Sequence, residues 1–551
     1  MAHGVRRGDE VGTSGRALLV LVSAGLHALA FPPWGLSALA WVVLVPFVRA
    51  LDGVGPGAAL LLGLLWGTAA IWGVGYWVPL AFADYYQQPL WFGVLFALGA
   101  SVVFAGSYTA GFAATARLVG ARTRGAPRVV LLAAVWVAWE LARARLLTGD
   151  PWLLLGYARV PWTTMIQVAD LGGVYALSFL VALVNVALVE VLRARARGPA
   201  AAVRALAPAA LAVLGAWAYG LTALATPAPA SRAATITVVQ GNNDLGTQWR
   251  EEFYGEGLNE YLRMSYEAAA RSEPDLLVWP ESAVTFFLAH EERYRQGIAR
   301  VLDAVDADLL LGAPHHDGTD GAPRYFNSAF YVTSDGRIRD RYDKTHLLPF
   351  AEYFPLRTIE FLRRRFERVR YFTPGTAPRP LETALGKVAT VICFEGIFPE
   401  IVRRQMVAGA VLLVNLSNDA WLGRGAGPEQ HLAMVVLRAV EHRVWVVRAT
   451  TSGVSAFVDP HGRITGRTAT FVPAVLEQEV RPASVPTFYK RRGDVFAYAC
   501  LAVAIAAALG AWRAGRNMAR AKAAHERSGP AAAPPARVAS QSPRSSSSSR
   551  A

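Results

Sequence analysis

The chain has 551 residues, of which 53% are hydrophobic and only 17% are charged. This composition is too apolar for an ordinary soluble protein, and the length suffices for a membrane region plus a complete further domain. The formal net charge of +14 does not indicate nucleic-acid binding, because much of it lies in loops and the C-terminal tail and we find no nucleic-acid-binding motif.

Apolar runs of about 20 residues, long enough to cross a bilayer as helices, recur along the chain. We predict seven before residue 227 and an eighth near the C-terminus: residues 14–31, 35–51, 57–81, 89–116, 127–147, 173–192, 203–225 and 494–512. The expected fold is a multi-pass α-helical membrane protein with about eight transmembrane helices and an inserted α/β domain. The first run resembles a signal peptide, but because further spans follow at once we interpret it as a retained anchor.

Arginines indicate the orientation of these spans, since Lys and Arg accumulate in cytoplasmic loops. They precede the first span and follow the second, fourth, sixth and eighth. We therefore expect a cytoplasmic leader at residues 1–13, a membrane domain at 14–226 and a disordered, Ser-rich cytoplasmic tail at 513–551. Arg143, Arg145 and Arg159, near the loop after span five, fit this orientation least well.

Residues 233–485 differ from the rest, because hydrophobicity drops there and short strand-like and helix-like segments alternate. We predict an extracytoplasmic α/β domain. Of the two cysteines, only Cys393 lies in it, while Cys500 lies in the last span, so a disulfide is not expected. Cys393 is then either a buried structural thiol or a nucleophile. The segment "KVATVIC" reads as a strand and "FPEIVRRQMVAGA" as a helix, which predicts a lowered thiol pKa.

Two other segments also place a charged residue where catalytic groups are often found, after an apolar strand or in a loop. Glu281 follows the apolar run "PDLLVW", and Lys344 in "DRYDKTHLLPFAEYFP" precedes Glu352 by eight residues. Each would ordinarily be a solvated loop residue. Only four of the 55 basic residues are lysines, so a Lys kept at 344 favours a site that needs a compact ammonium group.

Eight motifs together resemble the apolipoprotein N-acyltransferase family, whose catalytic part belongs to the carbon-nitrogen hydrolase (nitrilase) superfamily. They are "HALAFPPWGLSALAWVVLVPF", "GLLWG…GYWV", "WELARARLLTGDPWLLLGYARV", "QGNNDLGTQW", "VWPESA", "YDKTHLLPFAEY", "ICFEGIFPE" and "LSNDAWLG…GPEQHLAM". The resemblance covers roughly residues 18–512. It implies an α-β-β-α sandwich for residues 233–485.

The resemblance also implies roles for individual residues. The catalytic set would be Cys393 as nucleophile, Glu281 as general base and Lys344 beside the oxyanion. Glu352 and Glu395 would support it, and Trp249, Phe394 and Trp421 would bind substrate or lipid. The sequence departs from the family pattern at three positions: Phe394 replaces a frequent Tyr, Asp150 a common aromatic residue and Ala351 a usual Gly.

The implied reaction is a two-step acyl transfer at the outer face of the cytoplasmic membrane. Cys393 would take an acyl chain from a phospholipid as a thioester and pass it to the α-amine of a diacylglyceryl-cysteine apolipoprotein. No metal or organic cofactor is implied. Two alternatives stay open: a membrane-anchored nitrilase-type amidase or hydrolase that uses water as acceptor, and a non-catalytic binding or transport protein.

Three further features carry expectations of their own. Glu140, inside span five, is expected to pair with Arg143 one helical turn away. His315 and His316 lack ligand-spaced partners, so we expect a surface loop. Residues 355–372 mix aromatic residues with arginines, which is typical of a segment lying on a membrane surface.

Overall fold

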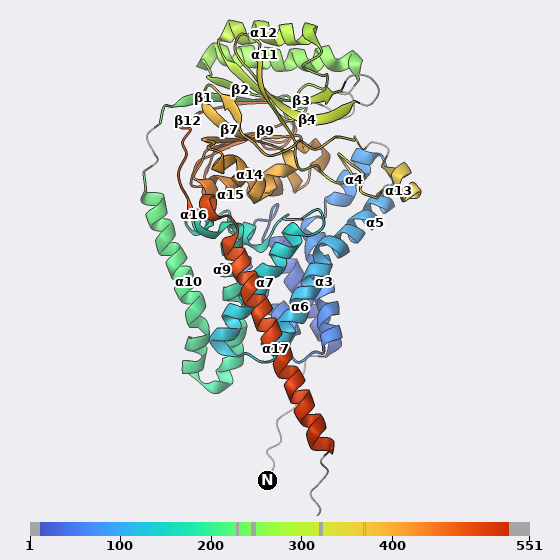
Figure 1. Ribbon diagram of the computed structural model, residues 1–551, viewed down its shortest axis with the longest axis vertical. Helices are drawn as coiled ribbons and strands as arrows, with labels where there is room; N and C mark the ends of the chain where they lie inside the picture. The colour runs from blue at the N-terminus through green and yellow to red at the C-terminus, as the bar shows by residue number, and fades with distance from the viewer. Residues whose placement is uncertain are drawn as a thin grey trace, which may run out of the picture.

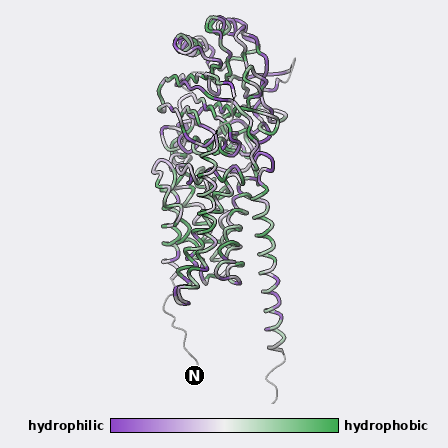
Figure 2. The backbone as a smooth tube through the Cα atoms, turned by 90° about the vertical axis from the view of Figure 1, so that its left-hand side faces the viewer, coloured by the Kyte–Doolittle hydropathy of each residue, from purple (hydrophilic) through white to green (hydrophobic). Residues whose placement is uncertain are grey.

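The computed structural model describes residues 12–227, 231–243, 250–318, 323–356, 358–366, 369 and 371–527. A two-sheet domain lies above a bundle of long helices, and the last helix runs alongside the bundle and projects beyond it (Figure 1). Hydrophobic residues dominate the bundle, whereas polar residues are frequent in the upper domain (Figure 2). The predicted division into a membrane part and an α/β part is confirmed.

The helical part is built from the following elements: α1 (Thr13–Leu29), η1 (Ser37–Trp41), α2 (Val45–Ala50), α3 (Pro56–Val74), α4 (Val78–Tyr86), α5 (Leu90–Ser101), η2 (Val102–Gly106), α6 (Ser107–Gly120), α7 (Gly125–Arg145), η3 (Leu155–Arg159), α8 (Thr163–Ile166), α9 (Ala169–Ala194), η4 (Arg195–Arg197), α10 (Pro199–Ala225) and α17 (Val495–Arg527). Six described helical stretches are long and apolar enough to cross a bilayer: α3, α5–α6, α7, α9, α10 and α17. The number of spans, eight, stays a prediction, because α1 and residues 37–50 are shorter.

The predicted span at 35–51 is not one helix. The chain forms η1 and α2 with a break between them, and Asn185 of α9 occupies the break. Its Oδ1 accepts from the backbone N–H of Leu44 at 2.7 Å, and its Nδ2 donates to the Ala40 carbonyl at 2.8 Å. Irregular backbone is tolerated in an apolar region only when its polar groups are satisfied in this way.

Two other spans differ from the prediction. The run at 57–81 divides into α3 and α4, and α4 with the start of α5 projects sideways from the bundle toward the upper domain (Figure 1). Helix α17 continues to Arg527, so residues 513–527 are helical where a disordered tail was predicted. The remainder of that tail, 528–551, and the leader, 1–11, lie outside the described residues.

The upper domain contains two six-stranded sheets, in the orders β12-β1-β2-β3-β4-β5 and β11-β10-β9-β8-β7-β6. The strands are β1 (Ala234–Gln240), β2 (Leu276–Val278), β3 (Asp308–Asp317), β4 (Arg324–Val332), β5 (Ile338–Asp343), β6 (Leu381–Thr383), β7 (Gly386–Ile392), β8 (Leu412–Ser417), β9 (Val446–Thr450), β10 (Ala456–Val458), β11 (Ile464–Arg467) and β12 (Ala474–Val480). In each sheet the inner strands pair in parallel and the outer ones antiparallel. His315 and His316 lie in β3, so the expected loop is wrong.

The helices of the upper domain are η5 (Glu251–Phe253), α11 (Tyr254–Ser272), α12 (Glu292–Val305), α13 (Glu360–Arg365), η6 (Cys393–Ile397), α14 (Pro399–Val407), η7 (Asp419–Leu422), α15 (Gly427–His442) and α16 (Phe488–Arg492). Four of them, α11, α12, α14 and α15, cover the two outer faces of the paired sheets. Helices α11 and α12 lie on the side away from the bundle, and α14 and α15 lie between the second sheet and the bundle (Figure 1). The α-β-β-α sandwich is therefore confirmed. Buried aliphatic residues of both sheets form the core between them.

The two parts share one continuous apolar core, which includes residues of the bundle helices, α14 and α15. Polar contacts add to it. Gln430 of α15 is fully buried and accepts from the indole N–H groups of Trp77 and Trp152, both at 3.2 Å. Its amide nitrogen donates to the carbonyls of Pro32 at 2.9 Å and Val74 at 3.0 Å. One side chain of the upper domain thus joins three segments of the membrane part.

Glu140 in α7 does not form the expected ion pair with Arg143. Its Oε1 accepts from the Trp136 indole at 2.9 Å and from the backbone N–H of Leu155 at 2.8 Å. Arg143 instead donates to the Trp152 carbonyl at 2.6 Å. Spacing on one helix places the two side chains on the same face, but the loop after α7 folds back and offers each a different partner.

Candidate active site

Cys393 lies at a sharp turn between β7 and η6. Strand β7 ends at Ile392, one residue earlier than predicted, and Cys393 has a φ of +54°. Residues with a side chain rarely adopt this left-handed conformation, and it is typical of functional sites. The turn directs a side chain that is only 3% exposed toward the cavity described below. Both β7 and β8 are buried apolar strands, which fix the position of the turn.

The pKa of the Cys393 thiol is raised, not lowered as predicted. Burial is the main cause and the negative charge of Glu281 adds to it, while Lys344 acts in the opposite direction. The full helix α14 starts only at Pro399, so no long helix begins at the sulfur. A thiol in this environment stays protonated at neutral pH and requires a base to become a nucleophile.

Glu281 follows β2 after Trp279 and Pro280, as predicted. Its Oε1 accepts from Asn327 Nδ2 at 2.7 Å, and its Oε2 accepts from the backbone N–H of Asn418 at 2.7 Å. Burial raises the pKa of this carboxyl, and Lys344 partly offsets the increase. A fixed carboxylate with a raised pKa has the properties of a general base.

Lys344 is 1% exposed and lies directly after β5. Its Nζ is 2.8 Å from Glu352 Oε2 and 3.7 Å from Glu281 Oε1. Burial alone would lower the pKa of the ammonium group, but Glu352 and Glu281 together raise it. Lys344 is therefore a permanent positive charge. Asn327 of β4 also donates to Glu352, at 2.7 Å, so one amide orders both carboxylates.

Glu395 is fully buried and lines neither cavity described below. Its Oε1 accepts from Tyr342 Oη, from Thr345 N and Oγ1, each at 2.8 Å, and from His346 N at 3.1 Å. Its Oε2 accepts from the Ile392 N–H at 2.9 Å. Glu395 thus connects the segment after Lys344 to the residue before Cys393.

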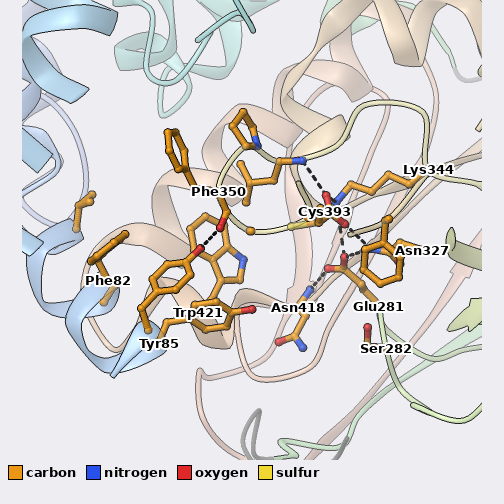
Figure 3. A pocket seen from close by; sticks show the side chains of 18 of the residues that line it. Phe82, Tyr85, Glu281, Ser282, Asn327, Lys344, Phe350, Cys393, Asn418 and Trp421 are labelled. Carbon is orange, nitrogen blue, oxygen red and sulfur yellow. Dashed lines mark hydrogen bonds and ion pairs between the residues drawn. The ribbon is translucent and has the colours of Figure 1, made fainter. Parts of the chain in front are cut away.

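A cavity of about 270 Å³ brings these residues together. Glu281, Asn327, Lys344 and Cys393 lie on one side of it, and Phe82, Tyr85 and Trp421 lie on the other (Figure 3). Phe82 and Tyr85 belong to α4, and Trp421 to η7. Polar reacting groups therefore border an apolar space that the sideways-projecting helix α4 lines. This combination suits a substrate with a polar centre and an apolar chain.

The remaining predicted site residues occupy different positions. Trp421 lines both this cavity and a second one, whereas Phe394 lines only the second. Trp249 lies outside the described residues. In the part of the chain that the structure describes, no group of three or more His, Cys, Asp or Glu side chains is arranged to hold a metal ion.

Sequence reasoning missed Asn327 and Asn418. Asn327 was detectable as a lone amide in the strand segment "YFNSAFYV", and Asn418 lies within the motif "LSNDAW". Asn418 contributes its backbone N–H, which any residue except Pro would supply, so its identity gave no direct signal. Two further buried residues, Arg448 and Asp419, form an ion pair at 2.6 Å beneath this loop.

Comparison with known proteins agrees with this architecture. A family model described as carbon-nitrogen hydrolase matches residues 235–488, and one described as apolipoprotein N-acyltransferase N-terminal domain matches residues 23–187. A Geobacter metallireducens protein named apolipoprotein N-acyltransferase is 38% identical over 496 residues, covering 89% of this chain and 94% of that protein. Proteins of the same name from Azotobacter vinelandii and Pseudomonas aeruginosa are 34% and 32% identical, each covering 86% of this chain and 91% of the relative. The chain therefore belongs to the apolipoprotein N-acyltransferase family.

Proposed function

We propose that this protein N-acylates apolipoproteins, with a membrane phospholipid as acyl donor and Cys393 as the carrier of the acyl group. The observation that carries the proposal is the shared cavity, in which a buried thiol, a carboxylate and an ammonium group border an apolar space lined by α4. Relatives that align with this chain over about nine-tenths of their own length are named for this activity.

In the first step Glu281 accepts the thiol proton and Sγ attacks the ester carbonyl of the donor. The Lys344 ammonium group stabilises the tetrahedral oxyanion, because a fixed positive charge in a dry cavity acts strongly on charge that develops there. The intermediate collapses to a thioester. The lysophospholipid leaves with the proton that Glu281 had accepted, so the carboxylate is restored.

In the second step the α-amine of a diacylglyceryl-cysteine attacks the thioester. Glu281 accepts a proton from the amine and returns it to Sγ as the carbon–sulfur bond breaks. Asn327 and the Asn418 N–H keep Glu281 in position through both steps, since each holds one carboxylate oxygen at 2.7 Å. Glu352 is the closer counter-charge of Lys344, at 2.8 Å, which leaves Glu281 available to exchange protons.

We further propose that the protein resides in the cytoplasmic membrane with the two-sheet domain on the extracytoplasmic side. The arginines that follow spans two, four and six support this orientation. The long helices and the two-sheet domain occupy opposite ends of the molecule (Figure 1), which fits a domain held at one membrane surface.

The decisive test is mass spectrometry of a lipoprotein N-terminus from cells with and without this protein. A third acyl chain that depends on the protein, and that disappears in the Cys393→Ala variant, is expected. Release of free fatty acid or ammonia without any acylated lipoprotein would instead establish the nitrilase-type hydrolase. An unchanged function in Cys393→Ala would establish a non-catalytic role.

A further inference from the structure

A second cavity of about 270 Å³ lies beside the first. The two cavities share a wall formed by seven residues: Trp77, Val78, Phe96, Leu348, Pro349, Phe350 and Trp421. The second cavity extends along α3, α5 and the loop after α7, and Phe394, the residue next to Cys393, also lines it. It therefore has room for part of an amphiphile whose reacting group reaches the thiol.

Asp150 is the only ionisable residue among those that line this second cavity in the described parts of the chain. Its Oδ1 accepts from the Trp152 backbone N–H at 3.1 Å. The described residues provide no hydrogen bond to its Oδ2. Arg143, whose charge acts on Asp150, directs its Nη2 to the Trp152 carbonyl at 2.6 Å. A carboxylate in apolar surroundings is costly unless a cation or donor approaches it.

The loop that carries Asp150 lines the same cavity as Phe394, the residue after Cys393. A Cβ atom added at the neighbouring Gly149 would approach Phe398 Cε1 to 3.2 Å, and Gly149 has a φ of +74°. The Trp152 ring lies 5.9 Å from the ring of His431 in α15. Both contacts are with the upper domain, close to the turn at Cys393. Asp150 is thus placed to bind a polar group at one end of a lipid whose ester or amine reaches Cys393.

We propose that the second cavity is a subsite for a lipid with a primary ammonium group, and that Asp150 binds that ammonium through its free oxygen. This inference rests on the proposed function. One carboxylate cannot satisfy a divalent metal ion, which requires several oxygen ligands, but it suits a single ammonium group enclosed by apolar walls. Two substrates of the proposed reaction carry such a group. In a phosphatidylethanolamine donor it is separate from the reacting ester, whereas in the lipoprotein acceptor it is the α-amine itself, which docks as an ammonium and must be released and deprotonated before it attacks the thioester.

The test compares the wild-type protein with Asp150→Asn, a change of charge at constant shape. Step one is acylation of Cys393, followed by intact-protein mass spectrometry with either phosphatidylethanolamine or phosphatidylglycerol of matched chains. Step two is transfer from the preformed acyl-enzyme to a diacylglyceryl-cysteine peptide, with kcat and KM measured separately. Asp306→Asn, at the far end of α12, is the matched control. Acylation of Cys393 in the wild-type protein is measured first. If the proposed function is wrong, no sample will show an acyl adduct on Cys393.

We expect Asp150→Asn to slow one reaction selectively by about ten- to a hundredfold, the value of a hydrogen bond to a charged group. Slower acylation from phosphatidylethanolamine alone identifies the donor headgroup as the ligand. A raised KM for the peptide with unchanged acylation identifies the acceptor amine. Equal effects on both donors with an unchanged acceptor KM, or no effect on either step, would overturn the proposal.

Discussion

Lys344 shows how burial gives a single residue its role. Its side chain is 1% exposed and has carboxylates at 2.8 and 3.7 Å, so two anionic partners fix the position of a compact cation. A guanidinium group is planar and wider, and it would displace either Glu352 or the charge that faces the oxyanion.

We predict that Lys344→Arg lowers kcat by roughly a hundredfold or more, the usual cost of losing one oxyanion-stabilising group. Lys387→Arg is the control, because Lys387 is 44% exposed and forms an ion pair with Glu382 at 3.2 Å on the surface. Turnover is measured with phospholipid and a diacylglyceryl peptide. A Lys344→Arg enzyme as fast as the wild type would show that Lys344 does not act on the oxyanion.

The sequence predicted that Glu281 and Cys393 follow buried apolar strands, because such a pattern is visible without a structure. The strand before Lys344 is charged and mostly only half-buried, so it gave a weaker signal. The sequence did not predict the environment of the thiol. The expected helix N-terminus would lower the pKa of Cys393, but the turn into η6 places the sulfur beside Glu281 in a buried cavity. The pKa of a side chain depends on residues that are close in space but far apart in sequence, and the local sequence pattern does not reveal such neighbours.

Helix α13 and the residue after it form one of the contacts between the upper domain and the projecting arm of α4 and α5. The ring of Phe366, just after α13, lies 5.4 Å from the ring of Phe82 and 5.7 Å from that of Phe96. Arg365 lies over the rings of Trp91 and Phe92 and donates to Gln88 at 3.0 Å. Figure 1 shows α13 beside α4 and α5, at the side of the molecule. The predicted membrane-surface segment at 355–372 is described except for 357, 367–368 and 370.

We predict that replacing the exposed Arg363 and Arg364 with Gln lowers activity on anionic vesicles by about tenfold or more, since each surface arginine contributes about 1 kcal/mol of attraction to such membranes. Activity on neutral vesicles should change less. The control variant replaces Arg271 and Arg293, exposed on α11 and α12 far from the helical bundle. Equal activity of both variants on anionic vesicles would refute contact between α13 and the membrane.

Element boundaries were predicted well where apolar runs are continuous and poorly where side chains from elsewhere satisfy the backbone. Spans five, six and seven correspond closely to α7, α9 and α10. The break at 35–51 depends on Asn185, 141 residues from Leu44, and hydropathy cannot reveal such a partner. The helical residues after 512 were mistaken for disorder because the Ser-rich composition of the end of the tail was extended too far.

At the scale of the whole molecule, Gln430 joins the two-sheet domain to the membrane helices. Its four hydrogen bonds reach Trp77, Trp152, Pro32 and Val74, and Trp77 lines both cavities. We predict that Gln430→Leu destabilises the folded protein by about 3 kcal/mol or more, because buried polar groups left without partners cost about 1–3 kcal/mol each. Denaturant unfolding in detergent measures the change, with exposed Gln296→Leu on α12 as control. An unchanged midpoint would show that apolar packing alone holds the two parts together.

Both parts of the molecule form the cavity, and this leads to a kinetic prediction about the complete enzyme. The reacting groups come from the upper domain, and much of the apolar wall comes from α4, so water has little access to a thioester formed there. Given phospholipid without an acceptor, the enzyme should stall at the covalent intermediate. Intact-protein mass spectrometry should therefore detect one acyl group on Cys393, and hydroxylamine should remove it because it cleaves thioesters.

Two variants make this prediction specific to the proposed chemistry. Glu281→Gln should form no adduct, because the buried thiol has a raised pKa and would lack a base to accept its proton. Cys500→Ala should retain the adduct, because the only other cysteine lies in α17, away from both cavities. Active enzyme with unmodified Cys393 and steady release of free fatty acid would mean that water reaches the thioester. In that case the cavity serves hydrolysis, and acyl transfer to an amine is not its reaction.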